Sequence, residues 1–152
     1  MDKNDIREFK NSLLQGDFDK AKLYIKDLDN EKIYDLIVEI NFNDESMVSY
    51  CFLASLLHDN ETAELHINAA SFLTFFLFHI QGAYNSALYH LRQAIKLDPD
   101  NIEYQELLLH FNEIPDRLVS QDEAIAVAKN ILKDKSDSSV ALRILSDYKI
   151  NN

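Results

Sequence analysis

Apolar side chains recur every three or four positions along most of this chain, which is the spacing of one buried face on an α-helix. The first four stripes of this kind are Ile6–Leu13, Phe18–Leu28, Ile33–Ile40 and Met47–Ser55, the last of them containing Met47, Val48, Cys51, Ala54 and Ser55. Each stripe gives its helix one face to bury against a neighbour. The pattern therefore predicts that the front of the chain is a series of short amphipathic helices.

The middle and the end of the chain continue the pattern. A fifth predicted helix runs from Glu61 to Ile80 and is apolar nearly all round, which places it at the centre of the core. A sixth, over residues 84–97, stops at Asp98-Pro99, since proline cannot continue a helical hydrogen-bond ladder. Three more are predicted over residues 101–111, from Ser120, and over 137–149. We expect about nine helices in all, arranged as antiparallel pairs.

Two local features support this all-α reading. The sequence has only two glycines and two prolines, whereas a protein rich in β-hairpins needs such residues in its turns. Ser120 and Glu123 have the spacing of a capping box, in which each side chain satisfies a backbone N–H at the start of a helix. The single cysteine, Cys51, lies in an apolar run, so we expect it to be buried and unable to form an intrachain disulfide.

Three segments repeat a short motif in which a small residue follows a turn: Gly16–Ala21, Gly82–Ala87 and, more weakly, Ser120–Ala124. Ala87 and Ala124 are 37 residues apart. That separation is close to the period of about 34 residues found in tetratricopeptide (TPR) repeats. We place the excess at Ile114-Pro115-Asp116, where the chain contains its second proline.

The stretch Gly82–Asn101 resembles the second helix of a TPR repeat and its exit turn. Ala87 and Ala94 provide the small residues at helix crossings, Leu91 lies between them, and Leu97-Asp98-Pro99-Asp100-Asn101 forms the turn. Alanines at such positions let two helices approach closely. The copy that begins at Asp122 is degenerate, because Ser136 stands where the proline would be. The resemblance implies one TPR-like α-solenoid domain over residues 1–152, with repeats in 61–149 and divergent helices in 1–60.

Charge narrows the classes of partner. The chain has 26 acidic and 15 basic residues, a formal net charge of -11. Nucleic acids are bound through clusters of lysine and arginine, so nucleic acid is excluded as the expected partner. An acidic surface either keeps the protein in solution or attracts a basic protein. Both explanations remain open at this point.

The sequence predicts a cytoplasmic protein that does not enter a membrane. Its first five residues are polar and mixed in charge, unlike a secretory signal. The most apolar segment, Ala69–Phe78, is shorter than the roughly 20 residues needed to span a bilayer.

A search for catalytic or metal-binding patterns gives no candidate. The five histidines, His58, His66, His79, His90 and His110, form no metal-binding motif, and we place His79 at the end of the apolar helix. No glycine-rich loop for phosphate and no nucleophile motif is present. We therefore predict no enzyme activity, no catalytic residues, no metal and no cofactor, and we expect no small-molecule ligand.

The candidate partner-binding residues are Glu103, Glu106, His110 and Glu113. Their spacings of three, four and three put them on one stripe of the helix that follows Pro99. The TPR resemblance implies that first-helix positions of this kind line the groove where partners bind. A solvated helix face is the alternative interpretation.

The chain also resembles short TPR proteins of bacteria, some of which act as toxin immunity proteins. That resemblance and the acidity together predict an inhibitor that binds and neutralises a basic toxin domain such as a nuclease. The alternative is a scaffold or secretion-chaperone adaptor that holds a peptide or helix in an apolar groove.

Overall fold

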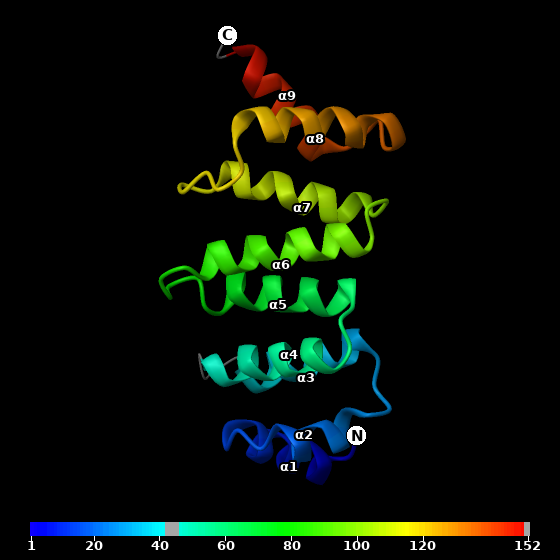
Figure 1. Ribbon diagram of the computed structural model, residues 1–152, viewed down its shortest axis with the longest axis vertical. Coiled ribbons are helices and arrows are strands. Elements are labelled where there is room, and N and C mark those ends of the chain that lie inside the picture. Colours follow the sequence, from blue (N-terminus) through cyan, green and yellow to red (C-terminus); the bar gives the residue numbers. More distant parts are fainter. Residues whose placement is uncertain (42–45, 151–152) are drawn as a thin grey trace. The chain divides into compact units, whose positions relative to one another are not determined.

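The structure is a computed structural model. It describes residues 1–41 and 46–150, and residues 149 and 150 are described by their backbone alone. Within those ranges every regular element is an α-helix, and there are nine (Figure 1). They are α1 (Lys3–Leu14), α2 (Phe18–Ile25), α3 (Asn30–Asn41), α4 (Met47–Asp59), α5 (Ala63–Phe75), α6 (Ala83–Leu97), α7 (Ile102–Glu113), α8 (Gln121–Asp134) and α9 (Ser139–Ile150). The predicted fold class, an all-α chain of TPR-like helix pairs, is confirmed.

The helices belong to two compact units, Met1–Ala87 and Leu88–Asn152, which meet inside α6. In the first unit, α1 packs against α2 and α4, while α5 packs against α3 and α4. The centre of this unit is aromatic: the rings of Phe9 and Phe18 each meet Phe52 edge to face, at centroid distances of 5.6 and 5.5 Å. Edge-to-face pairs place the positive edge of one ring on the negative face of another, which fixes their geometry.

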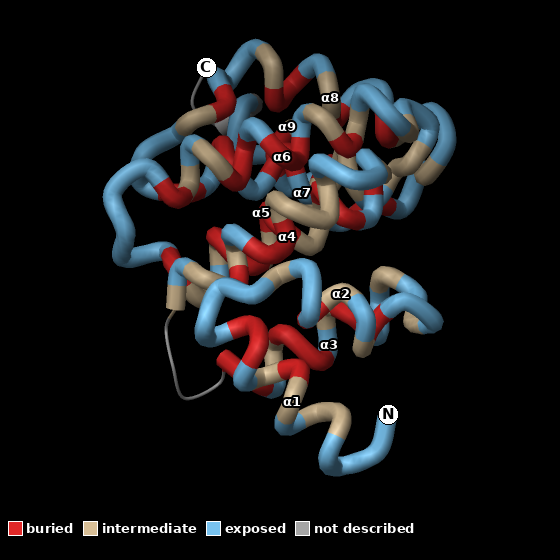
Figure 2. Tube along the Cα trace, turned by 60° about the horizontal axis from the view of Figure 1, so that its bottom comes forward, coloured by how far each residue is buried: buried red, intermediate tan, exposed pale blue. Residues whose placement is uncertain are grey.

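The second unit contains the rest of α6 together with α7, α8 and α9. Here α8 packs against α7 and α9, and α9 also packs against α7. Ala94, Ala124 and Ala128 are fully buried in this unit. Figure 2 shows buried residues alternating with exposed ones along each helix, as an amphipathic stripe requires. The small residues identified from the repeat therefore lie in the core.

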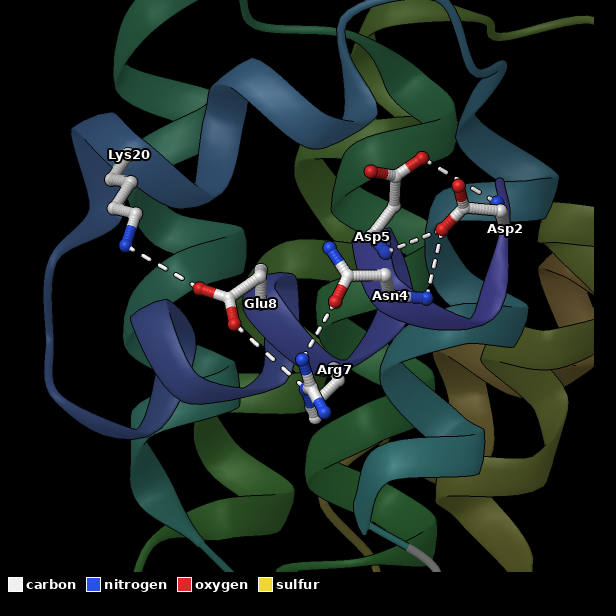
Figure 3. A network of polar contacts seen from close by, with 6 residues as sticks. All are labelled: Asp2, Asn4, Asp5, Arg7, Glu8 and Lys20. Carbon is white, nitrogen blue, oxygen red and sulfur yellow. Dashed lines mark hydrogen bonds and ion pairs between the residues drawn. The ribbon is translucent and has the colours of Figure 1, made fainter.

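The start of α1 shows how these short helices are stabilised at their ends (Figure 3). The Asp2 carboxylate accepts hydrogen bonds from the backbone N–H groups of Asn4 and Asp5, both at 2.8 Å, and the Asp5 side chain accepts from the Asp2 N–H. This is a capping box, which satisfies donors that the helix itself leaves unpaired. Glu8, one turn later, lies between Arg7 and Lys20 at 3.9 and 3.8 Å.

The prediction for residues 61–80 is wrong in two respects. The helix α5 ends at Phe75, and residues 76–82 form a turn, so His79 lies in that turn rather than at a helix end. Phe75, Phe78 and Ile80 are also exposed rather than central, with Phe75 at 70%. A continuous apolar run contains no stop signal, and the connection to α6 uses its last residues for turns that close at Gly82, where φ is +83°.

The predicted buried face of α4 is wrong as well. Met47 and Cys51 are exposed, whereas Ser49, Phe52 and Leu53 are buried. The first ten residues of this helix are nearly all apolar, so periodicity alone could not select its inner face. Cys51 is therefore an accessible thiol and not a buried hydrophobic residue.

The predicted capping box at α8 is half formed. The Ser120 hydroxyl accepts a hydrogen bond from the Glu123 N–H at 3.2 Å, as expected. The Glu123 carboxylate, however, pairs with the Arg92 guanidinium on α6 at 2.9 Å. An ion pair between two helices has replaced the local bond, and it joins α6 to α8 within the second unit.

Candidate partner-binding surface

The predicted site lies on α7, and both ends of this helix are well defined. The Asn101 side chain caps its start by accepting from the Tyr104 N–H at 3.3 Å. Its end comes at Ile114, whose backbone is extended because Pro115 follows. Leu108, Leu109 and Phe111 are buried and fix the rotation of the helix.

Glu106 of the predicted stripe is held by the chain itself. Its carboxylate accepts a hydrogen bond from the Ser138 hydroxyl at 2.6 Å and one from the Lys135 ammonium at 3.0 Å. The hydrogen bond from Ser138 lowers the pKa of Glu106 below its usual range, and Lys135 acts in the same direction. Burial of the carboxylate raises the pKa, but by less than the Ser138 hydrogen bond lowers it. Only 18% of the Glu106 side chain is exposed. Glu106 therefore fastens the turn before α9 to α7.

Glu113, at the end of the same helix, is held by a residue of α9. Both of its carboxylate oxygens accept from Arg143 on α9, from Nε at 2.7 Å and from Nη2 at 2.8 Å. This two-pronged geometry is the strongest that an arginine can offer a carboxylate, and the pair raises the pKa of Arg143. Two of the four predicted residues thus connect α7 to α9.

Glu103 and His110 are the members of the predicted stripe that no hydrogen bond or ion pair holds to another helix of the described chain. Both are exposed, and Leu107, between them on the same helix face, is exposed too at 45%. The His110 ring meets Phe111 edge to face at 6.1 Å. The structure therefore brings the four residues onto one face of α7. The side chains available to a partner there are Glu103, His110 and Leu107, because Glu106 and Glu113 already bind other parts of the chain.

A second acidic face lies on α3 and was not identified from the sequence. Glu31, Asp35 and Glu39 are spaced by four residues, all three are exposed, and their side chains form no hydrogen bond or ion pair with the described part of the chain. Like charges at this spacing repel each other. The four-residue spacing is present in the sequence, but the exposure of this helix face follows only from how α3 packs.

Next to this acidic face is a shallow groove of about 240 Å³ in the first unit. Asp35 and Glu39 form part of its rim, and its apolar lining is Met1, Ile6, Leu28 and Leu36. Lys32, the cationic side chain among its lining residues, is paired with Asp29 at 2.6 Å, and Met1 carries the terminal ammonium group. The groove can therefore accept an apolar chain that ends in a cation, such as the side chain of arginine or lysine.

The acidic excess is concentrated in the first unit. Residues 1–87 contain 15 acidic and seven basic residues, which accounts for -8 of the net charge of -11. Several of those acids are paired, for example Asp59 with Lys22 at 2.6 Å and Glu61 with His66 at 2.9 Å. The three acids of α3 form no such pair, so their negative charge is available to a partner.

The described residues form neither a metal site nor a membrane-spanning helix. No group of three or more His, Cys, Asp and Glu side chains lies close enough together to hold a metal ion. None of the helices formed by these residues has both the length and the apolar character needed to cross a bilayer.

A comparison with protein families finds one match, described as TPR repeat, over residues 77–108. The matched residues include the stretch Gly82–Asn101, on which the resemblance was argued. Neither the curated proteins nor the solved structures contain a significant match to the chain. The family match and the all-helical fold together make this a TPR-like helical protein. TPR repeats are typically non-catalytic and bind other proteins, which supports a protein-interaction role for the matched residues.

Proposed function

We propose that this chain is a non-enzymatic, acidic binding protein that captures a basic protein and neutralises it, as an immunity protein neutralises a basic toxin domain such as a nuclease. The observation that carries the proposal is the exposed face of Glu31, Asp35 and Glu39 on α3, whose carboxylates form no hydrogen bond or ion pair with the described part of the chain. Three unpaired carboxylates accelerate encounter with a basic surface and favour it over an acidic one.

Fewer residues of the α7 stripe can contact a partner than the sequence predicted. Glu103 and His110 are free to meet a partner, whereas Glu106 and Glu113 are already held by Lys135, Ser138 and Arg143. Replacing all four residues would change the packing of α9 as well as the charge. A test of the α7 stripe as a partner-binding site therefore requires Glu103→Gln alone.

The main test compares two variants with the same change in charge. The first replaces the α3 acids (Glu31→Gln, Asp35→Asn, Glu39→Gln), and the control replaces three exposed aspartates of the second unit (Asp122→Asn, Asp134→Asn, Asp137→Asn). Each is used with the wild type to capture partners from the native host, and the affinity for a captured protein is then measured over a salt series. A protein that neutralises the partner must also suppress that partner's activity when the two are mixed.

We expect the captured partner to be basic and the α3 variant to bind it about tenfold more weakly at low salt, with the difference shrinking as salt rises. The control should bind like the wild type. An acidic partner, or equal loss of affinity in both variants, would contradict the proposal.

A second candidate function is a scaffold or adaptor that binds an apolar segment of another protein. The exposed side chains of Phe75, Phe78 and Ile80 favour it, because three large apolar groups within six residues are rarely left in water without a use. This function predicts that partner binding changes little with salt and is lost when Phe75 and Phe78 are replaced by serine.

A further inference from the structure

A second groove in the first unit lies where four helix ends meet. It is formed by the ends of α2 and α4 and the starts of α3 and α5, and its volume is about 430 Å³. This is within the range of roughly 300–1,000 Å³ that is typical of ligand sites. Its apolar lining comes from Ile25, Leu28, Ile33, Leu56 and Leu65.

The floor of this groove is rigid and dry, because Ile25, Ile33 and Leu65 are at most 6% exposed and belong to the core. Leu28 and Leu56 are half-buried and form its walls. An apolar side chain of leucine size that entered would remove these walls from water, which favours binding in proportion to the apolar area buried.

The polar groups at the mouth are mainly hydrogen-bond donors. Lys22 points to Asp59 at 2.6 Å, and an ammonium has three donors, of which this pair uses one. Lys26 is exposed and, like the side chain of Asn60, forms no hydrogen bond or ion pair with the described residues. Among the residues that line the groove, two lysines accompany one aspartate, which is a formal excess of one positive charge.

Donors without acceptors, above an apolar floor, call for a ligand that supplies both an apolar group and carboxylate oxygens. We infer that this groove binds a segment of a partner protein in which an apolar side chain is flanked by aspartate or glutamate. The inference does not depend on the basic partner proposed above, because the groove and the α3 acids select opposite charges.

The experiment uses three short peptides with blocked ends, so that no terminal charge takes part: Glu-Leu-Glu-Leu-Glu, Gln-Leu-Gln-Leu-Gln and Glu-Ser-Glu-Ser-Glu. Each is titrated into the full chain labelled with nitrogen-15, and the dissociation constant is taken from the shifts of backbone amides around the groove. The inference predicts saturable shifts at Ile25, Leu28, Asn60 and Leu65 with the first peptide. It also predicts affinities at least about fivefold weaker for the other two.

Three variants separate the groove from general electrostatic attraction. Lys26→Gln removes one donor at the mouth and should weaken the Glu-Leu peptide about threefold to fivefold. Asn60→Trp places a large ring at the rim and should abolish binding. Lys3→Gln, at an exposed lysine on α1, is the matched control and should leave the affinity unchanged. Thermal denaturation of each variant checks that the fold is retained.

The inference is overturned by any of three results. The first is equal affinity of the glutamate and glutamine peptides. The second is an equal effect of Lys26→Gln and Lys3→Gln on the affinity for the Glu-Leu peptide. The third is that the shifted amides lie outside the groove.

Discussion

Glu106 joins two parts of the chain that are about thirty residues apart in sequence. It accepts from Ser138, and the same Ser138 hydroxyl accepts from the Ala141 N–H at 3.3 Å in the first turn of α9. The Glu106 carboxylate therefore orients Ser138, which caps the start of α9. Because the pKa of Glu106 is lowered in the folded protein, folding favours its ionised form.

The sign of the resulting pH dependence follows from that lowered pKa. The contribution of Glu106 to stability is fully present above its ordinary pKa of 4.5 and is lost as pH falls through its lower folded value. We predict that Glu106→Gln lowers the free energy of unfolding by about 1 kcal/mol at neutral pH. The difference from the wild type should shrink as pH falls from about 5 to about 3.

Urea denaturation of wild type and variant over this pH range measures the effect. Glu103→Gln is the control, since Glu103 is exposed on the same helix and should show no such pH-dependent difference. A constant deficit in Glu106→Gln at every pH would show that the carboxylate charge is not what stabilises the contact.

Sequence reasoning at the scale of residues succeeded where the cause was local. The cap by Ser120 and the burial of Ala87, Leu91 and Ala94 follow from short-range chemistry and spacing. The partners of Glu106 and Glu113 could not be found in this way, because Lys135, Ser138 and Arg143 reach them only after the chain has passed through another helix.

At the scale of elements, α6 is the helix whose limits were predicted best. Its apolar and small residues repeat regularly between two strong turn signals, Gly82 and Pro99. The end of α5 and the inner face of α4 were missed because both segments are apolar on every side. A helix of that composition can rotate or stop at several places with similar burial, and tertiary packing decides between them.

The alanine at position 87 tests whether α6 packs closely at the position that the repeat indicates. Ala87 is fully buried, so a tryptophan there must displace its neighbours. We predict that Ala87→Trp lowers the free energy of unfolding by about 1–3 kcal/mol or more. Tyr89→Trp, at a position on the same helix that is 57% exposed, should leave the denaturation midpoint nearly unchanged. Equal midpoints for the two variants would mean that the repeat register is wrong.

At the scale of the whole molecule, the acidic charge is unevenly distributed between the two compact units. The first carries -8 and the second -3, counted over residues 1–87 and 88–152. Self-repulsion in the compact state grows with net charge and is screened by salt. The first unit should therefore gain more stability from added salt than the second.

Hydrogen exchange followed by mass spectrometry can measure this for each unit in the intact chain. Between about 20 and 300 mM potassium chloride, we predict that exchange slows more for peptides from residues 1–87 than for those from 88–152. Chloride is preferred to sulfate, which strengthens apolar burial by itself. Equal slowing in both units would show that specific ion pairs, and not net charge, determine the salt response.

The fold class and the protein-binding role could be predicted from the sequence, since both rest on periodicity and on a repeat that spans only a few dozen residues. The groove above Ile25 and Leu65 could not, because it is formed by side chains from several helices. The four-residue spacing of the α3 acids is present in the sequence, but the exposure of that face follows only from how α3 packs. Their chemistry becomes visible only when the charges and apolar groups are placed together in three dimensions.

The exposed thiol on α4 has a practical consequence for all of these measurements. Cys51 is the single cysteine of the sequence, and it is accessible in the folded chain. A maleimide dye would therefore attach at one known position without any engineered substitution. The same accessibility lets two chains couple through a disulfide in an oxidising buffer, so a purified sample stored without reductant would acquire a covalent dimer that reflects storage and not biology.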